Sequence, residues 1–309
     1  MDQGIQKPVY TPFRGNHKPF TIATSPLDPG RWIEPDEEIG FYLSEKRALG
    51  ETHFDTIYKG EPETDAAQRE VLKELSDWLV TNRPDVWTRD GNLIHVAGQT
   101  VDLTDESLPP IVRAGLLVQD DLVLMRRGED GWRIAAAHLA FPSSWSLEEK
   151  FGKPMEQVHA SVPDFKGGTR NAMLINRMFD NFKPGMPVKR FNWTINWSYA
   201  LHLPATKTYA PSVEARRVHP GESFIRIERQ SLARMPVSGD LLFTIRIYID
   251  PVKAMEENPE LAPAALSLAD QLEGLTLEQA NYKGLTEKRP ELAAHLRAIA
   301  AAHARAETA

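Results

Sequence analysis

The stretch FIRIERQSLARMPVSGDLLFTIRIYIDP, residues 224–251, decides the fold because it predicts two long β-strands in succession. In its second half, Phe243, Ile245 and Ile247 alternate with Thr244, Arg246 and Tyr248. This period of two is typical of a strand with one apolar face. A third strand is predicted shortly before, in VKRFNWTINWSYAL at residues 188–201. We therefore expect three antiparallel strands in this part of the chain.

Helical patterns surround these strands. Apolar side chains recur at helical spacing in several segments, and Ser146 followed by Glu149 has the capping-box pattern that starts a helix. The longer helices are predicted over residues 37–50, ending at Gly50, and over residues 64–82, 168–183 and 251–306.

The order of these elements indicates the fold class. Short β-like runs begin near residue 90, helices follow, and the three long strands come after them. Strands do not alternate regularly with helices, so the fold is predicted to be α+β. A PAS domain has this order of elements: two strands, then a group of helices, then three antiparallel strands. We expect an N-terminal arm and helices at 1–89, a PAS-like antiparallel sheet core at 90–250 and a helical extension at 251–309, in one compact unit.

The composition excludes several functional classes. The chain has 309 residues, a formal net charge of −7 and no cysteine. The acidic balance argues against a nucleic-acid partner. Without cysteine, the chain cannot form disulfides, thiolate nucleophiles or cysteine-bound iron–sulfur clusters. Any metal or haem iron must be held by His, Tyr, Met or carboxylate ligands.

Targeting and nucleotide-binding motifs are also missing from the sequence. No apolar run approaches the roughly 18 residues that span a bilayer. The N-terminal MDQGIQKPVYTPF lacks the apolar region of a secretory signal. We therefore expect a cytoplasmic protein with no membrane partner. There is no P-loop and no G-x-G-x-x-G, so the chain carries no nicotinamide or flavin fingerprint.

The densest polar chemistry lies in the two predicted strands. Arg226 and Glu228 share one face of the first strand, and Arg229 lies on the other. Arg246 and Tyr248 share a face of the second. One interpretation is a solvated sheet face with cross-strand ion pairs. The other is a polar pocket whose guanidinium groups bind the carboxylates of a ligand.

Two histidines lie in apolar, structured contexts. His138 stands in AAAHLAFPSSW and His159 in MEQVHASVPDF. A lone buried histidine is more often a hydrogen-bonded structural residue than a metal ligand. The sequence pattern alone leaves both possibilities open for each of them.

Several long segments resemble one protein family. The likeness covers roughly residues 20–285, and the family is that of the haem-dependent oxidative N-demethylase α subunit, also described as a dimethylamine monooxygenase subunit. The segments are HLAFPSSWSLEEKFGKPMEQVHASVPDF (138–165), RFNW (190–193), RIERQSLARMPVSGDLLFTIRIY (226–248), PFTIATSPLDPGRWIEPDEE (19–38) and ANYKGL (280–285).

The resemblance implies a PAS-type domain that binds haem b and performs catalysis. The reaction it implies converts dimethylamine, O2 and NADPH to methylamine and formaldehyde. The electrons would come from a separate reductase subunit that carries FMN and a 2Fe-2S cluster, so a hetero-oligomer is expected. Because the chain has no cysteine, we expect a histidine rather than a thiolate as the iron ligand.

The resemblance also suggests roles for individual residues. His159 is the expected ligand of the haem iron, and His138 is the alternative. Arg226, Arg229 and Arg246 are candidates to bind the haem propionates. Glu228, Tyr248 and Asp164 are candidates to hold the protonated amine or to relay protons.

Two other functional classes remain open from the sequence. A haem-binding PAS sensor of gas or redox state would share the same features. A binding or structural α+β protein without a cofactor would use the arginine-rich strands as an ion-paired sheet, and the purified protein would be colourless.

Overall fold

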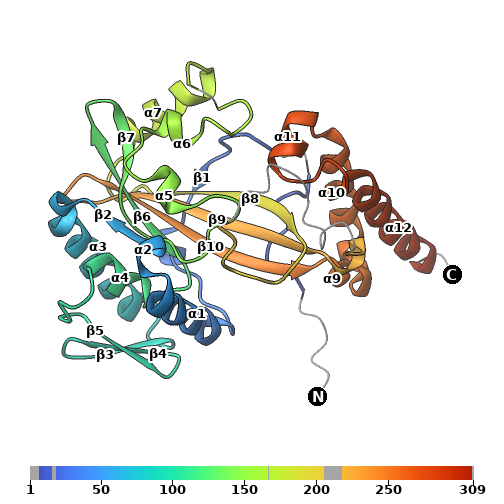
Figure 1. Ribbon diagram of the computed structural model, residues 1–309. Helices are drawn as coiled ribbons and strands as arrows, with labels where there is room; N and C mark the ends of the chain where they lie inside the picture. Colours follow the sequence, from blue (N-terminus) through green and yellow to red (C-terminus); the bar gives the residue numbers. More distant parts are fainter. Residues whose placement is uncertain (1–6, 16–18, 166, 205–217, 308–309) are drawn as a thin grey trace.

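A seven-stranded antiparallel sheet forms the centre of the molecule (Figure 1), in the order β1-β8-β9-β10-β6-β7-β2. A separate three-stranded sheet has the order β3-β4-β5. The computed structural model describes residues 7–15, 19–165, 167–204 and 218–307. The strands are β1 (Ser25–Pro26), β2 (Tyr58–Gly60), β3 (Trp87–Asp90), β4 (Leu93–Val96), β5 (Gln99–Asp102), β6 (Asp121–Gly128), β7 (Gly131–His138), β8 (Val188–Asn196), β9 (Phe224–Arg234) and β10 (Leu241–Pro251).

Helices cover both faces of the large sheet. Figure 1 shows α6 and α7 on one side, α1, α3 and α4 on the other, and α10 and α12 beyond one end. The α-helices are α1 (Ile39–Thr52), α2 (Phe54–Ile57), α3 (Asp65–Asn82), α4 (Pro110–Gly115), α5 (Leu147–Lys150), α6 (Met155–Val158), α7 (Arg170–Asn181), α9 (Lys253–Glu257), α10 (Ala262–Gly274), α11 (Leu277–Tyr282) and α12 (Arg289–Glu307). Short 3-10 helices are η1 (Pro29–Arg31), η2 (Pro62–Thr64), η3 (Pro220–Glu222) and η4 (Pro259–Leu261).

The sequence-based expectations for these elements are largely confirmed. The fold is α+β, β8, β9 and β10 are the three long strands, and Ser146 and Glu149 form the capping box of α5. The predicted end of α1 at Gly50 is wrong. Gly50 does not adopt the left-handed conformation that ends many helices, and α1 continues to Thr52, where the N–H of His53 donates to the carbonyl of Leu49.

The strand register divides the large sheet into two faces. Gln230 lies opposite Ile245, which in turn pairs with Asp121, so these three side chains share one face. Arg229 lies opposite Arg246, on the other face. We call the first the cavity face and the second the arm face, because the N-terminal arm crosses the second.

Two hydrophobic clusters cover the arm face. The first joins α1, α3 and α4 to β6 and β7 and includes Leu43, Leu75 and Leu122. The second joins the C-terminal helices to β8, β9 and β10 and includes Ile227 and Leu268. The C-terminal helices therefore complete the core beside the sheet.

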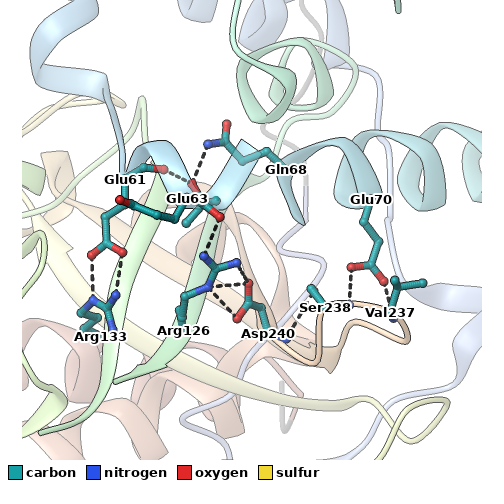
Figure 2. Close-up of polar contacts among 10 residues, drawn as sticks. Glu61, Glu63, Gln68, Glu70, Arg126, Arg133, Val237, Ser238 and Asp240 are labelled. Carbon is teal, nitrogen blue, oxygen red and sulfur yellow. Dashed lines mark hydrogen bonds and ion pairs between the residues drawn. The ribbon is translucent and has the colours of Figure 1, made fainter. Parts of the chain in front are cut away.

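Figure 2 shows a set of polar contacts that fixes α3 and η2 to the sheet. The guanidinium of Arg133 donates two hydrogen bonds of 2.7 Å to Glu61. Arg126 binds Asp240 through two of its nitrogens and also donates to the carbonyl of Glu63. The carboxylate of Glu70 accepts from the N–H groups of residues 237 and 238 in the β9–β10 turn. Among the described residues, no helix is long and apolar enough to span a membrane.

Candidate functional site

A cavity lies between the cavity face of the sheet and helices α5, α6 and α7. It has a volume of about 240 Å³. The sheet contributes Val123, Ile134 and Ile245 to its apolar walls, and α6 and α7 contribute Met155 and Phe179. The arm closes another side with Phe20 and Ile22.

One wall of the cavity is polar. Arg190 and Asn192 on β8 lie opposite Gln230 and Glu228 on β9, and all four line the cavity. The carboxylate of Glu228 accepts hydrogen bonds from Gln230 Nε2 at 2.8 Å and from Asn192 Nδ2 at 3.3 Å. The neighbouring positions on β10, among them Ile245, are apolar. The cavity is therefore apolar on one side and charged on the other.

Three cationic side chains line this polar wall. They are Arg190, Lys283 in the segment after α11, and Lys150 at the end of α5. The Arg190 guanidinium donates to the carbonyl of Thr21, while its buried Nε has no hydrogen-bond partner. Burial lowers the pKa of Arg190 and lowers the pKa values of both lysines to about 8. An enclosed cluster of cations of this kind is expected to favour an anionic ligand group.

A second, more polar space adjoins the cavity. We call it the outer chamber; it is lined by Ser144, Glu149, Gln157, Ser161 and Thr194 together with residues shared with the cavity, among them Ser143. The shared residues include Trp145, Lys150, Glu228 and Lys283. Lys150, Glu228 and Lys283 therefore lie at the junction of the two spaces, whereas Arg190 lines only the cavity.

His159 lines the cavity just after α6. Its Nδ1 lies 3.1 Å from the carbonyl oxygen of Met155. Because a carbonyl can only accept, Nδ1 carries the proton and donates it. Burial lowers the pKa of His159 to about 4, with smaller effects from Lys150 and Arg190, so the imidazole is neutral at pH 7. Nε2 then holds a free lone pair, which is the arrangement of a histidine that ligates a metal.

His138 has a different environment. It lies at the end of β7, opposite Leu122, and its side chain is on the arm face. It is 1% exposed and packs directly against α4, because a Cβ added to Gly115 would lie 2.0 Å from His138 Nδ1. Burial lowers its pKa well below the usual value. His138 therefore occupies a tight core position away from the cavity, and Gly115 is required beside it.

The three predicted propionate-binding arginines lie outside the cavity wall. Arg226 is on the cavity face, but its guanidinium donates to the carbonyls of Phe141 and Leu201. Arg229 and Arg246 are on the arm face, where they form ion pairs with Glu34 and Asp36. Arg226 therefore holds loop backbone, while Arg229 and Arg246 bind the N-terminal arm.

The predicted polar catalytic residues are also separated by the fold. Glu228 lines the cavity. Tyr248 is on the arm face, where its ring lies 4.5 Å from the guanidinium carbon of Arg246 and burial raises the pKa of its phenol far above the usual value. Asp164 is exposed in the loop before α7 and accepts a hydrogen bond from Gln279. Of the predicted site residues, the structure brings only His159 and Glu228 into the cavity.

Sequence reasoning missed four charged residues of the cavity, namely Asp121, Lys150, Arg190 and Lys283. Arg190 could have been found, because pairing the predicted strands places it on the same face as Gln230. Asp121 lies beneath the cavity, where its carboxylate accepts from the N–H groups of Ala140 and Phe141. Burial raises its pKa to about 6.

A comparison with known protein families gives a match over most of the chain. A family model described as haem-dependent oxidative N-demethylase, alpha subunit-like, matches residues 23–293. The chain belongs to this family. The family description implies an oxidoreductase that depends on haem and works with other subunits.

The family name implies a haem, so the residues that line the cavity can be compared with what a haem needs for binding. A haem needs an axial ligand, apolar walls for its ring and polar partners for its two carboxylates. His159 offers a neutral imidazole whose Nδ1–H is already donated to Met155. Arg190 offers a buried Nε without a partner. The residues present therefore fit a haem. Among the described residues, no group of three or more His, Asp or Glu side chains could hold a metal ion instead.

Proposed function

We propose that this chain is the haem-bearing catalytic subunit of an oxidative N-demethylase whose substrate is a small secondary amine, dimethylamine first among them. The observation that carries the proposal is His159, a neutral imidazole with its Nδ1–H donated to Met155, at the wall of a cavity that is apolar on one side and cationic on the other. This donor set suits haem b and gives each part of the cofactor a matching environment.

In this proposal His159 would hold the haem iron. Arg190 and Lys283 would bind the carboxylates, since both line the polar wall and burial disfavours their uncompensated charges. The apolar residues of β6, β7, α6 and α7 enclose the ring and exclude water. His138, Arg229 and Arg246 keep structural roles on the arm face.

Bound haem would supply the redox chemistry by which an N-methyl group is oxidised with O2. Two electrons come from NADPH through a reductase subunit that carries FMN and a 2Fe-2S cluster. Dimethylamine, O2, NADPH and one proton give methylamine, formaldehyde, NADP⁺ and water. The family name, which is that of an alpha subunit, supports the division into subunits.

Glu228 is the residue of this chain best placed to handle the amine. Its carboxylate lines both the cavity and the outer chamber, and Asn192 and Gln230 fix its orientation. A carboxylate in this position can hold a protonated amine as it enters from the outer chamber and accept its proton, which leaves a neutral amine in the apolar cavity. Phe20 and Trp145 add aromatic rings to the walls.

A PAS-like origin of the core is part of the same proposal. The sheet order β7-β6-β10-β9-β8 joins two strands that precede α5–α7 to three strands that follow them. This agrees with the order expected of a PAS domain. A haem sensor of the same fold would bind haem equally well, so only the response to an amine separates the two functions.

The test is an absorption spectrum of the haem-reconstituted protein, oxidised and dithionite-reduced, for the native chain and two variants. We expect a Soret band for the native chain and at least about 100-fold weaker haem binding for His159→Ala, because loss of a ligand costs more than loss of its supporting hydrogen bond. His138→Ala is the matched control. It should lose stability by about 2 kcal/mol or more, as expected for a cavity in the core, and keep haem binding.

Addition of dimethylamine then tests the catalytic part. A shift of the Soret band with dimethylamine, and formaldehyde production when the partner reductase and NADPH are added, would support the demethylase. A Soret band that does not respond to amines would favour the sensor. Absence of haem binding by the folded native chain would overturn the proposal.

A further inference from the structure

Lys150 is a cationic residue of the polar wall to which the proposed function assigns no role. It is the last residue of α5, whose start is fixed by the Ser146–Glu149 capping box. Its side chain lines both the cavity and the outer chamber. Its Nζ lies 4.6 Å from the centre of the Trp145 ring. The amine is therefore held at the junction of the two spaces.

The amine of the partly exposed Lys150 has no hydrogen-bond or ion-pair partner among the described residues, unlike the amines of the two buried lysines, Lys46 and Lys283. Lys46 donates to three carbonyls, including that of Gly115, and Lys283 donates to the carbonyl of Trp193. Two carboxylates are near Lys150. Glu149 is used in the capping box, and Glu228 accepts from Asn192 and Gln230. His159 and Arg190, which line the same cavity, add no compensating negative charge.

This environment raises the neutral fraction of the Lys150 amine above that of an exposed lysine. Burial lowers the pKa of Lys150 to about 8, whereas Glu149 and Glu228 only partly oppose the shift. An exposed lysine has a pKa of about 10.4, so at pH 7.5 the nucleophilic form of Lys150 is about 200 times more populated. In its neutral form, an unpartnered amine beside a cavity is a good nucleophile toward carbonyl carbon.

We propose that Lys150 is a carbonyl-capture site whose amine adds to small aldehydes at the junction of the cavity and the outer chamber. The Nζ–C bond forms as the carbonyl π bond breaks, and the amine proton moves to oxygen to give a carbinolamine. Loss of water then leaves a C=N bond to Lys150, with no change of oxidation state. The ligand class follows from the proposed function, because formaldehyde is the product released beside this lysine.

The experiment uses the full chain, with and without bound haem, limiting formaldehyde and sodium cyanoborohydride at pH 7.5. Cyanoborohydride reduces each imine to a stable N-methyl group, and peptide mass spectrometry reports the labelling rate of each lysine. We expect Lys150 to be labelled at least 10-fold faster than Lys73, which is exposed and paired with Asp77. Lys283, buried but hydrogen-bonded, is the second internal control. The Lys150 rate should level off above about pH 8, while the Lys73 rate continues to rise.

Lys150→Arg retains the charge and removes the nucleophile, so the fast labelling should disappear while circular dichroism stays unchanged. The proposal is overturned if Lys150 is labelled no faster than Lys73 in the native chain, a result that needs no variant. It is also overturned if bound haem abolishes labelling, because Lys150 would then be a partner of the cofactor carboxylate. Added formaldehyde makes the test independent of turnover, so fast labelling without demethylation would refute the proposed function and leave the capture site standing.

Discussion

The two faces of the large sheet carry similar charged residues in opposite situations. On the arm face, Arg229 and Arg246 pair with carboxylates of the N-terminal arm, and Arg229 also donates to two carbonyls of that arm. On the cavity face, Arg190 keeps a buried Nε without a partner, and Glu228 has only amide donors among its hydrogen bonds. The Nε atoms of Arg229 and Arg246 also lack a hydrogen-bond partner, but both guanidinium groups form ion pairs with the arm, and Arg190 forms none among the described residues. The arginines of the arm face are therefore paired with carboxylates of this chain, and Arg190 is not.

The difference indicates where ligand chemistry can occur. A buried charge that is fully paired contributes to the fold and leaves nothing for a ligand to compensate. A buried charge without a partner costs free energy unless a ligand supplies the missing partner. The same strand, β9, serves both purposes because alternate residues face opposite sides.

The largest effect is expected from Arg229→Met on the arm face. Removal of this guanidinium breaks the ion pair with Glu34 and the bonds to the arm carbonyls, so we expect a loss of about 3 to 5 kcal/mol in the free energy of unfolding. Haem bound per folded molecule should stay the same. Urea denaturation and a Soret titration measure the two quantities.

Arg170→Met, on the exposed side of α7, is the control for Arg229→Met and should change stability by no more than about 0.5 kcal/mol. If Arg229→Met remains stable and loses haem instead, then Arg229 binds a propionate, as the sequence suggested, and the contrast between the faces fails.

A smaller effect is expected from Asp121, the buried acid beneath the cavity. Burial raises its pKa to about 6, so the folded protein binds this proton more tightly than the unfolded chain does. Its contribution to stability is complete below about pH 4, the unfolded pKa, and is lost as the pH rises through 6. The loss is on the order of 2 to 3 kcal/mol. The variant Asp121→Asn removes this dependence of the free energy of unfolding on pH. The native chain should therefore lose stability relative to the variant between pH 4 and pH 7. Parallel stability profiles for the two proteins would contradict this interpretation of the cavity face.

The sequence predicted those features of the two sheet faces that depend only on residues close together in the chain. Period two in residues 224–251 correctly separated Arg226 and Glu228 from Arg229, because alternation is a property of the strand itself. The capping box of Ser146 was equally local. The family likeness was also confirmed, over residues 23–293.

What could not be predicted depends on contacts between distant segments. Alternation does not say which face of β7 meets a cavity, and the sequence does not say which face of the sheet α6 covers, so His138 and His159 could not be told apart. The partners of Arg229 lie 197 and 198 residues away in the arm. Lys283, in the segment ANYKGL, reaches the cavity only because α11 folds back against β8. Its sequence context carries no signal of that position.

The smallest change in stability is expected from Arg190→Met, the counterpart of Arg229→Met on the cavity face. Its Nε has no partner and its guanidinium makes one hydrogen bond, to the carbonyl of Thr21. Replacement of an incompletely paired, enclosed charge by an apolar side chain of similar length is often neutral or stabilising. We expect a change within about 1 kcal/mol for the haem-free protein, measured by urea denaturation.

The same variant should weaken haem binding by roughly 10- to 100-fold, the effect of losing one hydrogen bond between charged groups. Arg190→Lys should recover part of that affinity, since it restores the charge without the fork of donors. Haem titrations of the three proteins give the comparison. If Arg190→Met destabilises the haem-free protein as strongly as Arg229→Met and leaves haem affinity unchanged, both faces are structural and the carboxylate-binding wall must be sought elsewhere.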